Sequence, residues 1–141
     1  MNENQEQVFN WDRPLILSKR VAEQLYVLAA QHGSREACGL LFGEECDDVS
    51  IVNELISLPN LSKRPHRFLM SAVVSKRIQR EMTSTCIALF HTHEHDASPS
   101  ESDLDSLRLS SVTWLICAPD EMCVYAPNVH RRTLIIEEEI S

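Results

Sequence analysis

Residues 89–107 read LFHTHEHDASPSESDLDSL, and this stretch decides how the rest of the sequence is interpreted. It begins inside the apolar run CIALF (86–90), which is typical of a buried strand. Its second half belongs to SESDLDSLRLS (100–110), which is predicted to form a short helix. A strand that leaves the core and a helix that starts soon afterwards therefore enclose a run rich in histidine and acidic side chains.

The first two histidines of this stretch, His91 and His93, lie two positions apart where the strand ends. In a strand, residues i and i+2 project from the same face and lie roughly 6.5 Å apart along the chain. Two imidazoles placed in this way can converge on one metal ion. The same pattern also fits a strand end that alternates polar residues in solvent, so the pair needs support from elsewhere.

Support comes from Ser100 and Asp103, which have the spacing of a helix-capping pair. An acid on the first helical turn can be directed back at the strand end. Two neutral imidazoles and one carboxylate, with a fourth position left to water, form the ligand set of a catalytic zinc site. Asp105 is a rival carboxylate, but it lies about 200° further around the helix. His95, again two residues on, remains an alternative third ligand.

A hydrolytic zinc centre also needs a base that accepts the proton of the attacking water. The segment SREACGLLFGE (34–44) offers Glu36 at the edge of a predicted buried strand. Taken alone, Glu36 is interpreted as an ordinary surface glutamate, because charged residues seldom enter the interior.

The chain as a whole is predicted to be α/β (α+β), with one mixed sheet flanked by three helices. With 141 residues it is expected to form one domain, residues 14–141, after a polar lead-in, residues 1–13. The expected helices lie within residues 15–33 (N-cap Ser18, stop at Gly33), 71–84 (N-cap Ser71) and 100–110. The expected strands are 37–44 and 49–60, paired as an antiparallel hairpin, then 66–71, 85–93, 113–119, 122–127 and 131–139.

The charge pattern argues against nucleic-acid binding, because the formal net charge is -8, from 21 acidic and 13 basic residues. The small basic group His130, Arg131 and Arg132 is interpreted as a solvated edge strand. There is no apolar run long enough to span a membrane and no apolar leader, so we expect a soluble cytoplasmic protein.

The five cysteines form no CxxC pair and leave one over under any pairing, which argues against a disulfide framework and a cysteine zinc site. Cys38, Cys86 and Cys117 lie in apolar runs and are interpreted as small buried residues in a reducing compartment.

Glu36 in EACGLLFG, then HTH after CIALF, then PSESDL resemble the motif of the JAMM (JAB/MPN) zinc metalloproteases. The resemblance extends over residues 16–127 or so. It implies a curved mixed sheet flanked by helices, similar to the cytidine-deaminase fold. It also implies one zinc ion held by His91, His93 and Asp103, Glu36 as general base and acid, and Ser100 as the donor that stabilises the oxyanion.

The sequence departs from the family pattern in the loop after the histidines. Glu94 stands where the family usually has proline, and six residues rather than seven separate His93 from Ser100. Glu94, His95 and Asp96 are therefore expected to be exposed loop residues close to the metal.

The resemblance implies hydrolysis of a peptide or isopeptide bond that follows the tail of a ubiquitin-like protein. The chain has little room for a linkage-reading insertion and looks like a compact bacterial-type member, for which we favour deconjugation in an antiphage operon. The alternatives are tail processing of a sulfur-carrier protein, a non-catalytic MPN-type scaffold, and a phosphoesterase, for which His32, His66 and His130 are too scattered. A deaminase is excluded, because the chain lacks HxE and PCxxC.

Overall fold

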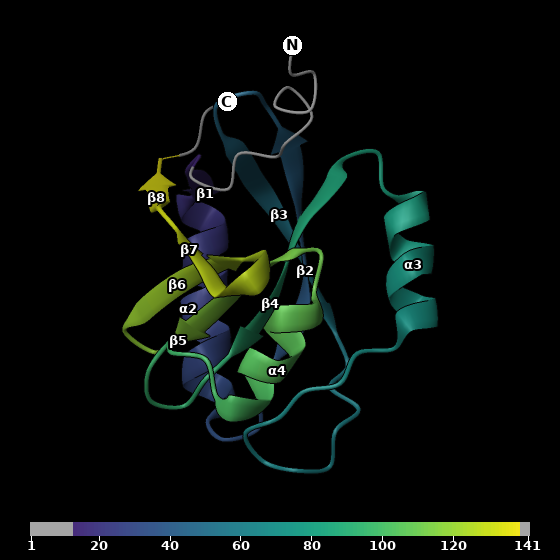
Figure 1. Cartoon of the computed structure of the whole chain (residues 1–141), viewed down its shortest axis with the longest axis vertical. Coiled ribbons are helices and arrows are strands. Elements are labelled where there is room, and N and C mark those ends of the chain that lie inside the picture. The colour runs from purple at the N-terminus through teal and green to yellow at the C-terminus, as the bar shows by residue number, and fades with distance from the viewer. Residues whose placement is uncertain (1–12, 139–141) are drawn as a thin grey trace.

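A computed structural model describes residues 13–138, which form an eight-stranded mixed sheet with three α-helices around it (Figure 1). The expected lead-in therefore lies outside the described residues, except for Arg13. The elements are β1 (Leu15–Ser18), α2 (Lys19–His32), β2 (Cys38–Glu45), β3 (Ser50–Leu58), α3 (Ala72–Glu81), β4 (Thr85–Thr92), α4 (Glu101–Leu109), β5 (Thr113–Ala118), β6 (Glu121–Ala126), η1 (Pro127–Val129), β7 (His130–Arg132) and β8 (Leu134–Glu137). Across the sheet the strands are ordered β7-β6-β5-β4-β2-β3-β1-β8. The predicted fold class is confirmed.

The three predicted helices are present with their predicted caps. The hydroxyl oxygens of Ser18, Ser71 and Ser100 each accept a hydrogen bond from the backbone N–H three residues later, which satisfies a donor that the helix leaves free. The first helix ends at Gly33, whose φ of 58° is a conformation that costs glycine little.

The centre of the sheet carries the strand that ends in the histidines. β4 lies between β2, to which it is antiparallel, and β5, to which it is parallel. β2 and β3 form the predicted antiparallel hairpin, with a register shift between Phe42 and Gly43. A Cβ atom at Gly43 would lie 1.8 Å from the carbonyl oxygen of Ile51, so only glycine permits this approach. A bulge of this kind bends the strand that carries it, which contributes to the curvature of the sheet.

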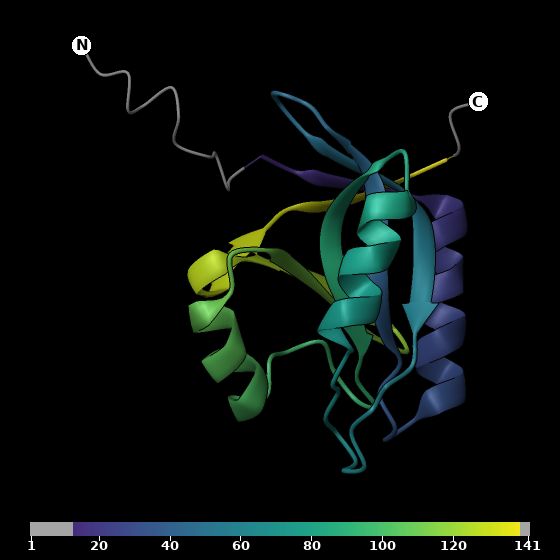
Figure 2. The ribbon, with the colours of Figure 1, turned by 90° about the vertical axis from the view of Figure 1, so that its right-hand side faces the viewer.

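Two helices cover opposite faces of the sheet, as Figure 2 shows for α2 and α4. α2 packs Val21, Leu25 and Ala29 into the larger core, and α4 packs Leu107 beside Trp114 of β5. α3 lies to one side and has no fully buried residue.

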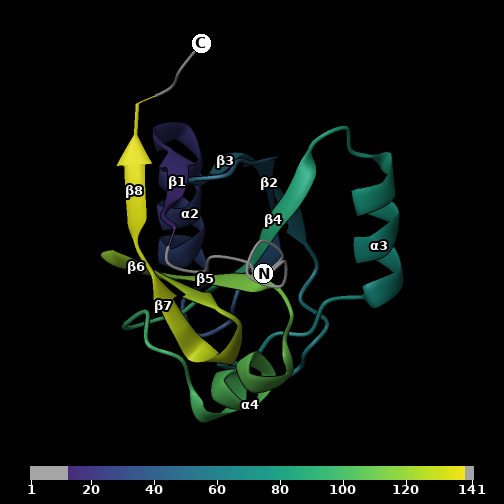
Figure 3. The same ribbon diagram turned by 45° about the horizontal axis from the view of Figure 1, so that its top comes forward.

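Strands β7 and β8 are consecutive in the chain, yet they pair at opposite ends of the sheet order. β7 pairs with β6, β8 pairs in parallel with β1, and only Thr133 separates them (Figure 3). The predicted strand 131–139 is therefore two strands. The carbonyl oxygen of Thr133 accepts a hydrogen bond from the backbone N–H of Leu15 (2.9 Å), so the strongly curved sheet nearly closes on itself at this point.

Arg132 holds this closure, and the expectation that it is a solvated edge residue is wrong. Its side chain is 3% exposed and donates hydrogen bonds to the hydroxyls of Ser50 and Thr113 and to the carbonyl oxygens of Arg13 and Pro14. The physical reason is the position of Arg132 at the junction where β7 and β8 pair at opposite ends of the sheet, whereas Arg131 projects outward. His130 and Arg131 are exposed as expected.

Three further expectations need correction. Residues 66–71 form no strand, because the loop that contains them is paired to a side chain rather than to a neighbouring strand. Residues Leu15–Ser18, which precede the cap of α2, form the unanticipated strand β1. Cys86 is only half-buried, whereas Cys38 and Cys117 are buried as predicted.

All five cysteines lie among the described residues and are free thiols. Burial raises the pKa of Cys38 to about 11 and that of Cys117 to about 12, so both are unreactive thiols at neutral pH. Within residues 13–138, no helix combines the length and the apolar character that crossing a membrane requires.

Candidate metal centre

His91 and His93 lie at the end of β4, as the alternation of the strand predicts. Their rings are 5.0 Å apart, and His91 is fully buried. The ring of Phe68 stacks on His91 at 4.3 Å, and Trp114 meets His91 edge-on at 5.4 Å. Aromatic contacts therefore fix the orientation of the inner imidazole.

Asp103 reaches both histidines from the first turn of α4. Its Oδ2 atom lies 3.2 Å from His91 Nε2 and 3.0 Å from His93 Nε2, and it accepts a hydrogen bond from the backbone N–H of Ser100. Ser100 Oγ in turn accepts from the backbone N–H of Asp103, so the predicted capping box is present. The same pair that starts the helix thus directs the carboxylate at the strand end.

Burial alone would raise the pKa of Asp103, but the hydrogen bonds with His91 and His93 outweigh it and hold the pKa well below its usual range. Burial would likewise lower the pKa of His93, yet the hydrogen bond with Asp103 and the nearby carboxylates raise it. For His91, burial prevails and lowers the pKa. Neutral imidazole at His91 is the form that binds a metal.

Glu36 is brought to the histidines by the antiparallel pairing of β2 and β4, in which Cys38 faces His91. Its Oε2 atom lies 3.6 Å from His93 Nε2, and its side chain is 4% exposed. Its buried Oε1 atom has no hydrogen-bond partner among the described residues. Burial raises the pKa of Glu36 to about 7, opposed by His93 and assisted by Asp103.

Sequence reasoning missed Thr92, which lies between the two histidines and points to the other face of the strand. Thr92 Oγ1 accepts a hydrogen bond from the backbone N–H of Ala37 (2.8 Å), and the backbone N–H of Thr92 donates to the carbonyl oxygen of Ala37 (2.9 Å). The residue after Glu36 is therefore fastened to the residue between the ligands. The sequence did hold a signal for this role, because the hydroxyl of a threonine in a buried strand must find a hydrogen-bond partner.

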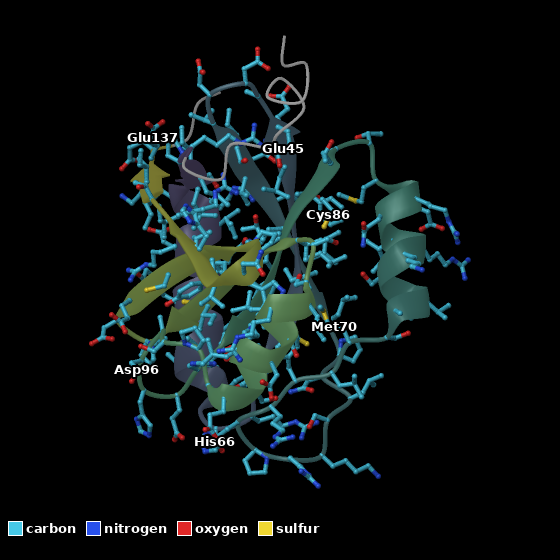
Figure 4. The ribbon with its side chains drawn as sticks, in the orientation of Figure 1. Glu45, His66, Met70, Cys86, Asp96 and Glu137 are labelled. Atoms are coloured by element: carbon cyan, nitrogen blue, oxygen red, sulfur yellow. The ribbon has the colours of Figure 1, made fainter. Side chains whose placement is uncertain are left out.

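The rim of the site contains the residues for which no role was assigned. A pocket lined by Glu36, His93 and Ser100 is also lined by His66, Glu94, His95 and Asp96. His66 and Asp96 are labelled near the lower end of the molecule in Figure 4. Glu94 Oε1 lies 3.9 Å from His66 Nε2 and 3.7 Å from His95 Nε2.

His95 and Asp105 point away from the convergent side chains. The side chain of His95 is 83% exposed, as expected for a loop residue, and it does not belong to the group that could hold a metal. Asp105 is exposed and pairs with Arg108, which confirms that the helix turns it away from Asp103.

The donor set fits a tetrahedral metal ion. Ligand atoms of Glu36, His91 and His93 all lie within 4.8 Å of one another, which makes them a possible metal-holding group. Asp103 Oδ2 lies closer to both histidines, at 3.0 and 3.2 Å, than Glu36 does to His93. Ligands at about 2.0 Å from zinc are separated by about 3.3 Å along the edges of a tetrahedron, which these separations approach. The carboxylates of Glu36 and Asp103 therefore both face the histidine pair, and that of Asp103 is the closer of the two.

The fold is shared with several solved structures. A solution structure of a protein from Desulfitobacterium hafniense is 24% identical, with a TM-score of 0.74, over 90% of this chain and 95% of that one. A JAB1/MPN domain protein from Archaeoglobus fulgidus is 20% identical, with a TM-score of 0.61, over 86% and 98%. A structure described as "JAMM: A Metalloprotease-like Zinc Site in the Proteasome and Signalosome" is 18% identical, with a TM-score of 0.56, over 88% and 98%. A search of curated proteins gave no match.

The fold is that of a JAB/MPN domain, and it carries a Glu-His-His group that could hold a metal ion. The family model for prokaryotic homologs of the JAB domain matches residues 18–133, so the chain belongs to this family. The resemblance inferred from Glu36, the histidine pair and the Ser100–Asp103 pair is thereby confirmed.

Proposed function

We propose that the protein is a zinc-dependent peptidase or isopeptidase that cleaves after the C-terminal tail of a ubiquitin-like protein. The observation that carries this proposal is the position of Glu36, a buried carboxyl 3.6 Å from a histidine that also contacts Asp103. A purely structural ion pair needs only one carboxylate. The second, buried and with one oxygen lacking a partner among the described residues, suits proton transfer.

In this proposal His91, His93 and Asp103 hold one zinc ion, with their facing atoms already close together. When bound, zinc supplies a Lewis acid that polarises the scissile carbonyl and lowers the pKa of water to about 7. Phe68 and Trp114, packed around His91, hold its ring in place for this task.

Glu36 acts as the general base and then as the general acid. Its buried carboxylate, 3.6 Å from His93, is placed to accept a proton from the attacking water and return it to the departing amine. Ser100 Oγ accepts the helix-capping hydrogen bond from Asp103, which leaves its O–H free to donate to a developing oxyanion at the pocket wall.

An extended tail would bind beside the site as a strand that pairs with the loop before α3 and not with the sheet. β4 is paired on both sides, with β2 and with β5, and offers no free edge. In the loop before α3, the backbone groups of Arg67 and Leu69 bond to Asn60, whereas those of Phe68 make no hydrogen bond within residues 13–138. The Phe68 backbone is thus available to an incoming strand.

The substrate class is tested with a fluorophore joined by an amide bond to the C-terminal glycine of ubiquitin-like proteins, including a sulfur carrier. We expect release of the fluorophore that is abolished by a chelator and restored by zinc. Preference for a ubiquitin-like conjugate would favour deconjugation, which we propose, and preference for the sulfur carrier would favour tail processing. Absence of zinc-dependent cleavage across the panel, with zinc bound, would contradict the peptidase assignment.

A further inference from the structure

The connection between β3 and α3, residues 59–71, is called the β3–α3 loop here, and it is organised around the side chain of Asn60. Asn60 Oδ1 accepts hydrogen bonds from the backbone N–H groups of Ser62 (2.9 Å) and Leu69 (3.0 Å). Asn60 Nδ2 donates to the carbonyl oxygens of Arg67 (2.9 Å) and Glu36 (2.8 Å). A carboxamide has two acceptor positions and two donors, so this side chain is fully used.

Three of these bonds lie within the loop, but the fourth crosses to the backbone of Glu36. Two further crossings reinforce it. Arg35 Nη2 donates to the carbonyl oxygen of Asn60 (3.0 Å), and the backbone N–H of His66 donates to the carbonyl oxygen of Ser34 (2.8 Å). The loop is therefore fastened to the short segment that carries Glu36.

The loop also contacts the histidine pair. Phe68, between the two residues whose backbone Asn60 holds, stacks its ring on His91 at 4.3 Å with an interplanar angle of 20°. It meets Trp114 edge-on at 5.5 Å. Asn60 thus fixes the backbone on both sides of the one loop residue that packs on an inner metal ligand.

We propose that Asn60 is a positioning residue that binds the β3–α3 loop to the Glu36 segment and keeps Phe68 stacked on His91. The loop and the metal site consequently form one mechanical unit. The inference rests on the proposed function for its zinc measurement, since it assigns His91 as a ligand. Only a carboxamide fits, because an aspartate would set an oxygen against the carbonyl oxygens of Glu36 and Arg67.

The test uses the full chain and the variants Asn60→Asp, Phe68→Ala and their double variant. Ser62→Ala is the matched control, because among residues 13–138 the Ser62 hydroxyl bonds only within the loop, to Arg64. Hydrogen exchange at the Leu69 amide reports the Asn60 bond, and competition with a chelator reports zinc affinity. We expect Asn60→Asp to speed Leu69 exchange, and Asn60→Asp and Phe68→Ala each to weaken zinc binding by about 10-fold. The zinc affinity of the double variant should also fall by no more than about 10-fold, because both changes remove the same contact, the Phe68 ring on His91.

Unchanged Leu69 exchange in Asn60→Asp, or losses of zinc affinity that multiply in the double variant, would overturn the inference. If Asn60→Asp does not fold, the stacking of Phe68 on His91 is tested with Phe68→Leu, which keeps apolar bulk but lacks the ring. Wild-type zinc affinity in Phe68→Leu would refute the proposed role of the loop. If the wild-type chain binds no zinc, the proposed function fails. The inference is then judged by the NMR signals of the His91 ring, which must shift in Asn60→Asp as they do in Phe68→Ala.

Discussion

Glu36 Oε2 lies 3.6 Å from His93 Nε2, although the two residues stand on different segments, which the β2–β4 pairing and the Ala37–Thr92 hydrogen bonds bring together. Asp103 contacts the same imidazole from α4. The pKa of Glu36 is raised to about 7, while that of Asp103 is held well below its usual range. Two carboxyl groups whose pKa values are pushed apart suit two roles, a proton carrier and a permanently charged ligand.

Glu36→Gln is expected to keep zinc bound and to lower hydrolysis by about 10²- to 10⁴-fold, the range for loss of a general base. Glu94→Gln is the matched control, because Glu94 lies at the rim and pairs with His66 and His95, and it should retain activity. The measurement is kcat/KM beside zinc content. Wild-type activity in Glu36→Gln would refute the assignment of the base.

The buried Glu36 should also make the stability of the metal-free protein depend on pH. Its pKa is about 7 when folded and about 4.3 when unfolded, so between these values the folded state holds more protons and stability falls as pH rises. The loss is on the order of 3 kcal/mol by pH 8. The raised pKa of His93 also makes stability fall as pH rises, and His93 is present in both the wild type and the Glu36→Gln variant.

This dependence is measured as the thermal midpoint of wild-type and Glu36→Gln proteins, both stripped of metal, from pH 5 to pH 8. The amide resembles the protonated acid at every pH. We therefore expect the wild type to lose stability relative to the variant as pH rises. A difference that stays constant across this range would contradict a raised pKa for Glu36.

Ser100 has a capping role and a proposed catalytic role, and these can be separated. Ser100→Ala should cost about 1 kcal/mol of stability, whereas Ser100→Gly costs only a few tenths because glycine is a tolerated N-cap. Both variants lack the hydroxyl, so both should lose about 10²- to 10³-fold in kcat. If activity follows stability, with Ser100→Gly nearly fully active, the hydroxyl has no role in hydrolysis.

Arg132 is expected to be essential for closing the sheet. Arg132→Met leaves two hydroxyls and two carbonyl oxygens without their donor, which should destabilise the protein by about 3 kcal/mol. The exposed Arg131 lies 5.9 Å from the ring of Tyr125, and Arg131→Met should cost less than about 1 kcal/mol. The free energy of unfolding of the two variants is measured with urea. Equal losses in Arg132→Met and Arg131→Met would show that the buried hydrogen bonds of Arg132 do not stabilise the fold.

Local signals in the sequence were sufficient for the helices and for much of the site. The serine caps are local chemistry, and the spacing of Ser100 and Asp103 led directly to a carboxylate beside the histidines. Strand alternation placed His91 and His93 on one side. These features depend on residues a few positions apart, where propensity and side-chain bonding act without help from the rest of the fold.

Features that depend on distant pairing were not predictable from single residues. The strand expected at 66–71 has suitable residues, but Asn60 supplies the bonds that a neighbouring strand would provide. Arg132 is buried only because β7 and β8 meet opposite ends of the sheet. The role of Glu36 was inferred from resemblance, since nothing near it in the chain distinguishes it from a surface glutamate.

The central claim is that His91, His93 and Asp103 form a zinc site that Glu36 serves. The most direct measurement is zinc content after equilibrium dialysis of the wild-type, His91→Ala and His95→Ala proteins. We predict about one equivalent in the wild type and in His95→Ala, whose exposed imidazole lies outside the group, and less than about one tenth in His91→Ala. Less than about one tenth of an equivalent in the wild type, or equal zinc content in His91→Ala, would contradict the account.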